Sequence, residues 1–237
     1  MLIALRRRFL FVANLKAASS SIETALAPHA EIRVSETRLG KHLPLEQIAL
    51  RYDWLLEHYP LERLFVFGVL RDPLAQLVSL YNFHQRVESG GRGRMPSTRG
   101  LDFDDFVRDW SANSWQAQGQ HRLFQHGGGL ALDALLDHAR LAPQFEAVAH
   151  HLGVRAALPH VNRSGGPLTA GEVSEATRAF VAERYAEDYA LLARCAGRYR
   201  TPDGWRPLEE LPPSPDLPPP PPSRWRGRLR RLLGGGS

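Results

Sequence analysis

Two continuous apolar runs dominate the hydrophobic pattern of this chain, and each leads directly into a helical pattern. The first run is Phe9–Ala13 and the second is Leu64–Leu70. Runs without a polar face are typical of parallel strands that are covered on both sides. The helices that follow them are predicted over residues 20–26 and 73–87. The pattern therefore predicts an α/β fold with a central, mostly parallel sheet flanked by helices.

The remaining elements are shorter, and their patterns are weaker. Glycines, a proline and the lack of any periodicity predict a loop over residues 88–100. Thr169–Glu172 has the pattern of a capping box that opens a helix, which is expected to continue, with or without a break, through residues 189–192. The other predicted elements are a strand at 32–34 and helices near 45–57, 103–110 and 143–151.

The first strand ends at a loop whose residue types suit an anion. Lys16 supplies a full positive charge, and Ser19, Ser20 and Ser21 supply hydroxyl donors where the helix begins. The first N–H groups of a helix lack intrahelical partners, and the helix dipole adds partial positive charge there. One of the three serines is expected to cap the helix. The loop predicts a phosphate site, but it is not a Walker A loop, because no glycine precedes the lysine.

The second strand ends at Arg71-Asp72-Pro73, which predicts a second phosphate site. Asp72 is expected to cap the following helix, and Pro73 suits its first position. Ser79 lies off the apolar stripe of this helix and is expected to be free to meet a ligand. Arg71 and Ser79 would then clamp a phosphate beyond the carboxyl ends of the strands, where open α/β sheets bind ligands. The apolar stripe comprises Leu74, Leu77, Val78 and Tyr81.

Together the two segments resemble the cofactor motifs of a known family. Lys16-Ala17-Ala18-Ser19-Ser20-Ser21 resembles the 5′-phosphosulfate loop of sulfotransferases that use 3′-phosphoadenosine-5′-phosphosulfate (PAPS). Arg71-Asp72-Pro73, followed by Ser79 and Tyr81, is similar to their 3′-phosphate motif, R-D-P-x-x-R-x-x-S-x-Y. The resemblance spans residues 8 to 195 and is nearest to carbohydrate sulfotransferases of the heparan-sulfate 2-O type. One departure is Gln76, which stands where the family has a second arginine.

The resemblance implies a P-loop-like three-layer fold and transfer of a sulfuryl group from PAPS to a hydroxyl acceptor, expected to be a carbohydrate, without a metal. Lys16 would stabilise the negative charge that develops on the departing 5′-phosphate oxygen. Arg163 and Ser164, which precede Gly165-Gly166, look like the late loop that closes over the adenosine or the 3′-phosphate. The other residues implied to contact the cofactor are Ala17, Ala18, Ser19, Ser20, Ser21, Arg71 and Ser79.

An acceptor hydroxyl needs a base, and imidazole titrates nearest to neutral pH. In the heparan-sulfate 2-O branch a histidine base lies between the two phosphate motifs, in a context similar to Lys41-His42-Leu43. His42 is therefore the predicted catalytic base, with His58 and His84 as its rivals. Glu23 is interpreted as an acid on the helix surface. Trp110 or Trp115 would stack on a sugar ring.

The charge balance argues against nucleic-acid binding by the folded part of the chain. The net charge of +5 arises from five arginines between residues 224 and 231, and the rest of the chain has equal numbers of basic and acidic residues. The α/β domain is predicted to span residues 1–205, followed by a Pro-rich linker at 206–223. The tail at 224–237 is either disordered or a basic amphipathic helix that contacts an anionic membrane surface.

The sequence also suggests a compartment. No segment reaches the roughly 20 apolar residues that span a bilayer. Residues 9–15 do not make a signal peptide, because the apolar run is short and lacks a cleavage site. The single cysteine, Cys195, excludes an intrachain disulfide and a cluster of cysteine metal ligands. Eukaryotic members of the family are typically anchored in the Golgi membrane, so a cytoplasmic bacterial enzyme is expected, with peripheral contact at the inner membrane surface through the tail as an option.

Two other functions remain open on the sequence alone. A P-loop nucleotide kinase would need a glycine-rich loop, which is absent, and a magnesium-binding acid at a strand end. A non-catalytic protein that binds adenosine 3′,5′-bisphosphate (PAP) or another nucleotide, or a membrane-associated interaction protein, is favoured if Gln76 marks decay of the cofactor site. The acceptor is equally open among glycans, glycolipids, lipid-linked sugars, small alcohols and protein tyrosines.

Overall fold

The computed structural model describes residues 1–35, 41–86, 100–159, 166 and 168–214, without the side chain of Trp110. Arg163 and Ser164 lie outside the described residues. The same holds for the basic tail, for residues 215–223 of the Pro-rich linker, and for the predicted loop except Gly100.

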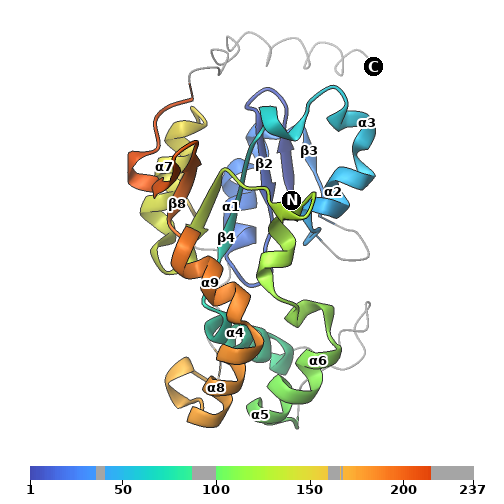
Figure 1. Ribbon diagram of the computed structural model, residues 1–237, viewed down its shortest axis with the longest axis vertical. Helices are drawn as coiled ribbons and strands as arrows, with labels where there is room; N and C mark the ends of the chain where they lie inside the picture. The colour runs from blue at the N-terminus through green and yellow to red at the C-terminus, as the bar shows by residue number, and fades with distance from the viewer. Residues whose placement is uncertain (36–40, 87–99, 160–165, 167, 215–237) are drawn as a thin grey trace, which may run out of the picture.

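A seven-stranded sheet forms the centre of the molecule (Figure 1). Its three middle strands, β2, β4 and β7, are parallel, which confirms the predicted parallel centre. The outer strands pair in the antiparallel sense, β3 and β1 on one side and β8 and β9 on the other. In spatial order the strands are β3 (Ile32–Arg33), β1 (Leu2–Ala4), β2 (Phe9–Val12), β4 (Phe65–Leu70), β7 (Ala134–Asp137), β8 (Arg198–Thr201) and β9 (Gly204–Pro207), and a separate hairpin pairs β5 (Gln125–His126) with β6 (Gly129–Leu130).

Helices cover both faces of the sheet (Figure 1). Helices α1 (Ser19–Leu26) and α7 (Leu141–His151) pack on one face. Helices α2 (Leu45–Arg51), α3 (Asp53–Leu56) and α9 (Ala186–Cys195) pack on the other. The remaining α-helices are α4 (Pro73–Arg86), α5 (Phe103–Asp105), α6 (Ser111–Asn113) and α8 (Glu175–Arg184), with one π turn at Phe106–Trp110 and 3₁₀ turns at Ala27–His29, Leu61–Arg63, Trp115–Ala117, Gln120–Phe124, His138–Arg140, Ala170–Glu172 and Leu208–Glu210.

The strands are apolar at every position because successive side chains point to opposite faces of the sheet, and both faces are covered by helices. In β2, Phe9 and Phe11 enter the cluster beneath α1 and α7, while Leu10 and Val12 enter the cluster on the other face. All four are fully buried. Burial of such a side chain contributes about 1.5–3 kcal/mol, so both faces of this strand stabilise the fold.

A third apolar cluster lies beyond the carboxyl ends of the parallel strands. It joins α4, α5 and α8 in the lower half of Figure 1. Asp72 caps α4 by accepting a hydrogen bond from the Ala75 N–H at 2.8 Å, and Pro73 is the first helical residue, both as predicted. This helical layer forms one wall of the space beyond the ends of β2 and β4, where both predicted phosphate sites lie.

Several boundaries differ from the sequence prediction. The helix expected over residues 45–57 breaks at Tyr52 into α2 and α3. The capping box forms at Thr169–Glu172, but the element that it opens is a 3₁₀ turn. Helix α8 begins later and has Ser174 as its own N-cap. The packed part of the chain also extends beyond residue 205, because β9 crosses that position and Leu208 is fully buried.

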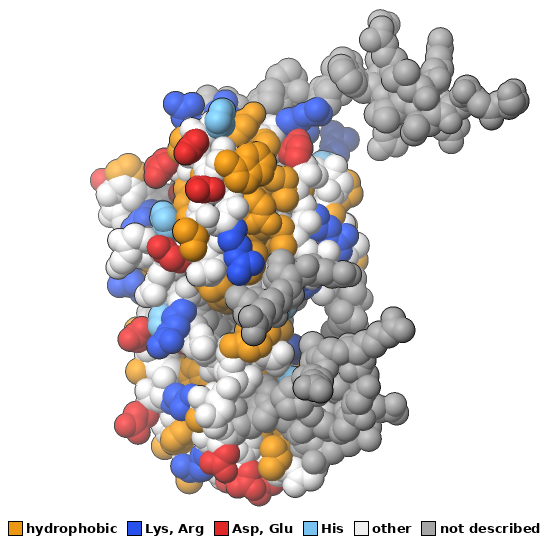
Figure 2. Space-filling view, turned by 90° about the vertical axis from the view of Figure 1, so that its right-hand side faces the viewer, with side chains coloured by type: hydrophobic (Ala, Val, Ile, Leu, Met, Phe, Trp, Pro, Cys, Tyr) orange, Lys and Arg blue, Asp and Glu red, His pale blue; other side chains and the backbone are white. Residues whose placement is uncertain are grey.

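An apolar patch lies on the outside of α2 and α3. Leu50 is 69% exposed, Trp54 61% and Tyr59 43%. Figure 2 views the molecule from this side and shows hydrophobic side chains gathered in its upper half, with acidic and basic side chains around them. Among the described residues, no helix is both long and apolar enough to cross a membrane.

Candidate anion-binding site

The loop between β2 and α1 has an unusual backbone. Lys16 and Ala18 have φ values of 57° and 56°, whereas Ala17 between them does not have a positive φ. Non-glycine residues rarely adopt this conformation, and it clusters at functional sites. Alternation of this kind turns successive N–H groups toward one side and makes a concave anion-binding nest.

The N-terminus of α1 is open within this nest. Its N-cap residue is Ala18, and no side chain makes a capping hydrogen bond there. The prediction that a serine caps the helix is therefore wrong: the left-handed turn starts the helix one residue before Ser19. The Ser21 N–H donates to the Ala18 carbonyl oxygen at 3.0 Å, which leaves the N–H groups of Ser19 and Ser20 to donate to a ligand. The helix dipole favours a negative charge at that end.

The two sequence motifs meet at this loop. The guanidinium of Arg71 donates from Nη1 to the carbonyl oxygen of Lys16 at 2.8 Å. The side chain of Gln76 donates from Nε2 to the carbonyl oxygen of Leu15, also at 2.8 Å. These contacts follow from the parallel pairing of β2 with β4, which brings both strand ends to one edge of the sheet. Gln76 therefore has a definite local role, which is to hold the backbone of the first loop.

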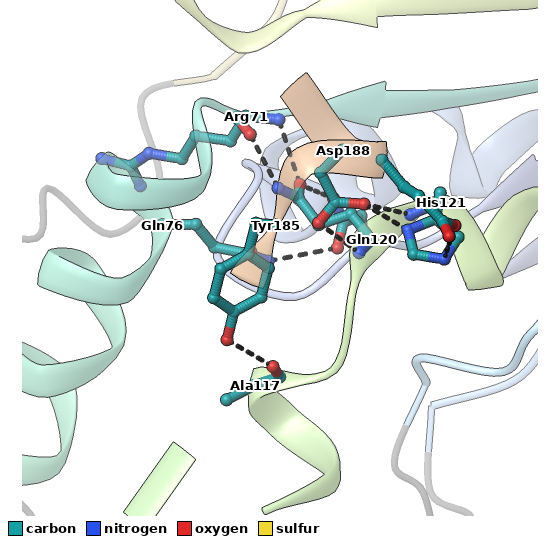
Figure 3. Close-up of polar contacts among 9 residues, drawn as sticks. Arg71, Gln76, Ala117, Gln120, His121, Tyr185 and Asp188 are labelled. Atoms are coloured by element: carbon teal, nitrogen blue, oxygen red, sulfur yellow. Dashed lines mark hydrogen bonds and ion pairs between the residues drawn. The ribbon is translucent and has the colours of Figure 1, made fainter. Parts of the chain in front are cut away.

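A buried polar network fixes the position of Arg71 (Figure 3). The side chain of Gln120 accepts from the Arg71 N–H at 3.1 Å and donates to the Arg71 carbonyl at 2.7 Å. Asn14 donates to Gln120 at 2.6 Å, and the fully buried Asp188 accepts from the Gln120 N–H at 2.8 Å. The Arg71 guanidinium extends away from this network, so the strand end is rigid while the charge faces elsewhere.

Arg71 and Lys16 are two cations that share a partly desolvated space. Burial lowers the pKa of Arg71 against the opposing charge of Asp72, and its buried Nε has no hydrogen-bond partner among the described residues. Burial, and then the charges of Arg71 and Arg86, lower the pKa of Lys16 to about 8. The Lys16 ammonium lies 4.5 Å from the centre of the Phe83 ring, a cation–π contact. Neither Lys16 nor Arg71 forms an ion pair with a carboxylate in the described part of the chain, so the site lacks a compensating anion.

The serines differ from one another in their surroundings. Ser19 and Ser21 are each 5% exposed, and Ser20 is half-buried. The hydroxyl of Ser20 accepts from the ammonium of Lys41 at 3.0 Å, and that ammonium forms an ion pair with Glu23 at 2.5 Å. Glu23 is 2% exposed, which corrects its interpretation as a surface acid. A second lysine therefore stands beside the serine run, a neighbour that the sequence pattern did not indicate.

Ser79 lies inside the molecule. It is 4% exposed and already interacts with its surroundings, which corrects the expectation that it is free to meet a ligand. The reason is that α4 is covered on more than its apolar stripe: Gln76 and Asn82 on the same helix are also buried. The anion-binding groups that the structure brings together are thus the Lys16–Ser20 loop and Arg71.

His42 lies against the end of β2. Its Nδ1 is 2.9 Å from the carbonyl oxygen of Ala13. Because a carbonyl oxygen only accepts, Nδ1 carries the proton and Nε2 presents a lone pair. Burial lowers the pKa of His42 to about 4, against the opposing effect of this hydrogen bond, so the ring is neutral at pH 7. The ring lines a cavity of about 100 Å³ together with Leu15, Gln76 and Trp115.

The rival histidines are placed less favourably. His58 lies at the end of α3, where its Nδ1 is 3.2 Å from the Trp54 carbonyl oxygen. His84 is fully buried, and its Nε2 is 2.6 Å from the side-chain oxygen of Gln116. Of the three candidates, His42 alone lines the same cavity as Leu15 of the first phosphate loop.

In comparisons with known proteins, no family model, no curated protein and no solved structure matches this chain. In the described residues, no three or more His, Cys, Asp or Glu side chains are arranged to hold a metal ion. The function must therefore be inferred from the site itself.

Proposed function

We propose that this protein is a PAPS-dependent sulfotransferase with a P-loop-like fold. One observation carries the proposal: the Lys16 loop and Arg71 meet at the carboxyl edge of the parallel strands, as two cationic groups that form no ion pair with a carboxylate of the described residues. PAPS carries a phosphosulfate at its 5′ end and a phosphate at its 3′ position, so it requires two such groups close together. The pair of motifs that resembles the family's cofactor site supports this choice over other anionic ligands.

The residues present fit this ligand. The nest, the open N-terminus of α1 and the Lys16 ammonium would hold the 5′-phosphosulfate. The planar guanidinium of Arg71, whose Nε has no hydrogen-bond partner among the described residues, would donate to the 3′-phosphate. Gln76 would support this site through the backbone of the first loop, so its presence in place of an arginine does not by itself mean that the site has decayed.

The mechanism that we propose assigns one task to each group. Lys16 and the loop N–H groups stabilise the charge that develops on the departing 5′-phosphate oxygen. His42 takes the proton of the acceptor hydroxyl at Nε2, which is the nitrogen not bound to Ala13. Negative charge nearby favours the protonated ring, so a bound donor raises the pKa of His42 toward neutrality. The acceptor is proposed to be a carbohydrate hydroxyl, because Trp115 is 41% exposed at the cavity beside His42 and offers a stacking surface.

The titration of Lys16 gives a direct test of its environment. The chain has only two lysines, Lys16 and Lys41, so ¹³C-methylated lysine side chains give a simple NMR spectrum. We expect Lys16 to titrate near pH 8 and its pKa to rise when PAP binds, because a bound anion favours the ammonium. Correspondingly, PAP affinity should fall as pH rises through about 8. A Lys16 resonance that is unchanged by PAP would contradict the assignment.

Transfer of labelled sulfate from PAPS to a panel of hydroxyl compounds tests the enzymatic function. We expect transfer by the wild-type protein, and a loss of roughly 100- to 10,000-fold in His42→Ala without loss of PAP binding, because only the proton acceptor is removed. His58→Ala is the matched control and should keep wild-type transfer. Full activity in His42→Ala would refute the base assignment. Binding of PAP without transfer to any acceptor would instead favour the non-catalytic binding protein.

A further inference from the structure

A histidine that the motifs do not include stands next to Arg71. In the parallel pairing of β4 with β7, Leu70 lies opposite Asp137. These two residues end their strands, and Arg71 and His138 are the residues that follow them. Both therefore leave the sheet at the same carboxyl edge, and the positive charge of Arg71 acts on the His138 ring.

The backbone around His138 is fixed by local hydrogen bonds. The Asp137 carboxylate accepts from the Ala139 N–H at 2.9 Å and so starts a 3₁₀ turn. The Asp137 N–H donates to Gln144 of α7 at 2.7 Å. His138 is therefore held at the very start of this turn, where it is half-buried.

The electrostatic environment of His138 resembles that of Lys16. Burial, and then the charge of Arg71, lower the pKa of His138 to about 4, while Asp137 opposes the shift. The imidazole is therefore neutral at pH 7, and it lies within the electrostatic reach of an arginine that forms no ion pair in the described part of the chain. A phosphate bound at Arg71 would reverse the sign of the local field and favour the protonated ring.

We propose that His138 is a further ligand of the 3′-phosphate, and that it takes up a proton when this phosphate binds to Arg71. The inference rests on the proposed function, since it requires PAP to bind at this edge of the sheet. Protonation of His138 makes the affinity for PAP rise as the pH falls below about 7.5. This effect is separate from the loss of affinity above about pH 8 that is expected from Lys16. Both ring nitrogens of a protonated imidazole donate, so the bound phosphate gains a charge-assisted hydrogen bond.

Calorimetric titration with PAP, in two buffers that differ in ionisation enthalpy, measures proton uptake directly. One fully linked proton changes the affinity by up to about tenfold per pH unit, so wild-type PAP affinity should rise between about pH 7.5 and 5.5. We expect His138→Gln to take up fewer protons and to show a gain in affinity at least about threefold smaller over this range. Adenosine 5′-monophosphate, which lacks the 3′-phosphate, should show no difference between the two proteins.

A matched control is His151→Gln. His151 is also a half-buried histidine with a pKa lowered by burial, but it packs on Phe65 at the opposite end of β4. This variant should behave as the wild type does. Equal proton uptake in His138→Gln and wild type would overturn the inference, as would a difference that persists with the monophosphate. Failure of the wild-type protein to bind PAP at any pH would instead refute the proposed function itself.

Discussion

Lys16→Ala is expected to lower the rate of sulfuryl transfer by roughly 100- to 1000-fold, the loss typical of removing one preorganised charge donor from a transition state. The effect should be larger on kcat than on the dissociation constant of PAPS, because charge on the departing oxygen develops only as the bond breaks. The nest and the helix N-terminus remain in this variant, which is why binding should survive in part.

Single-turnover transfer and equilibrium binding, measured on the same preparation, separate the two effects for Lys16→Ala. Arg63→Ala serves as control, because Arg63 is an exposed cation before the amino end of β4, whereas the site lies beyond the carboxyl end of this strand. It should match the wild type in both measurements. A rate for Lys16→Ala within a few-fold of the wild type would remove Lys16 from the mechanism and leave the loop as a binding element alone.

Arg71→Ala is expected to weaken PAP binding by roughly 10- to 150-fold, which corresponds to the loss of a hydrogen bond to a charged group. The Arg71 Nε has no hydrogen-bond partner in the part of the chain that the structure describes, so the phosphate would supply an acceptor for this guanidinium. Calorimetric titration measures the change. Arg71→Lys should recover only part of the affinity, because an ammonium keeps the charge but lacks the planar fork of donors.

The Arg71 side chain also holds the Lys16 carbonyl, so the fold of each variant needs a separate check. Thermal unfolding of each variant provides this check, with Arg63→Ala as the reference for a surface substitution. Removal of this one hydrogen bond should cost about 0.5–1.5 kcal/mol of the free energy of unfolding, which leaves the protein folded. Unchanged PAP affinity in a folded Arg71→Ala protein would place the 3′-phosphate elsewhere.

The two strand-to-helix units could be predicted from the sequence because their signals are local. The Phe9–Val12 and Phe65–Leu70 strands are continuous in their apolar residues, and Asp72-Pro73 marks a helix start. β7 escaped prediction because Asp133 and Asp137 interrupt its apolar run, which leaves only three consecutive apolar residues between them. The carboxylate of Asp133 accepts from the Val66 N–H at 2.7 Å, a contact that depends on the neighbouring strand and not on local pattern.

The candidate site was predicted in part for the same reason. Lys16 and Arg71 follow strands that the pattern reveals, so their meeting at one edge could be expected. The supporting groups could not be predicted, because Gln120 and Asp188 are far from Arg71 in the sequence. Gln120 contacts Arg71 directly, and Asp188 acts through Gln120. His138 depends on the pairing of β7, the strand that the pattern did not reveal.

The most direct test of the central claim is a calorimetric titration of the wild-type protein with PAP, beside ATP with magnesium. We expect PAP to bind well and ATP to bind weakly, because Arg71 and the Lys16 loop together match an adenosine that carries phosphates at both the 3′ and 5′ positions. The absence of PAP binding, or a clear preference for ATP with magnesium, would contradict the assignment of this site to PAPS.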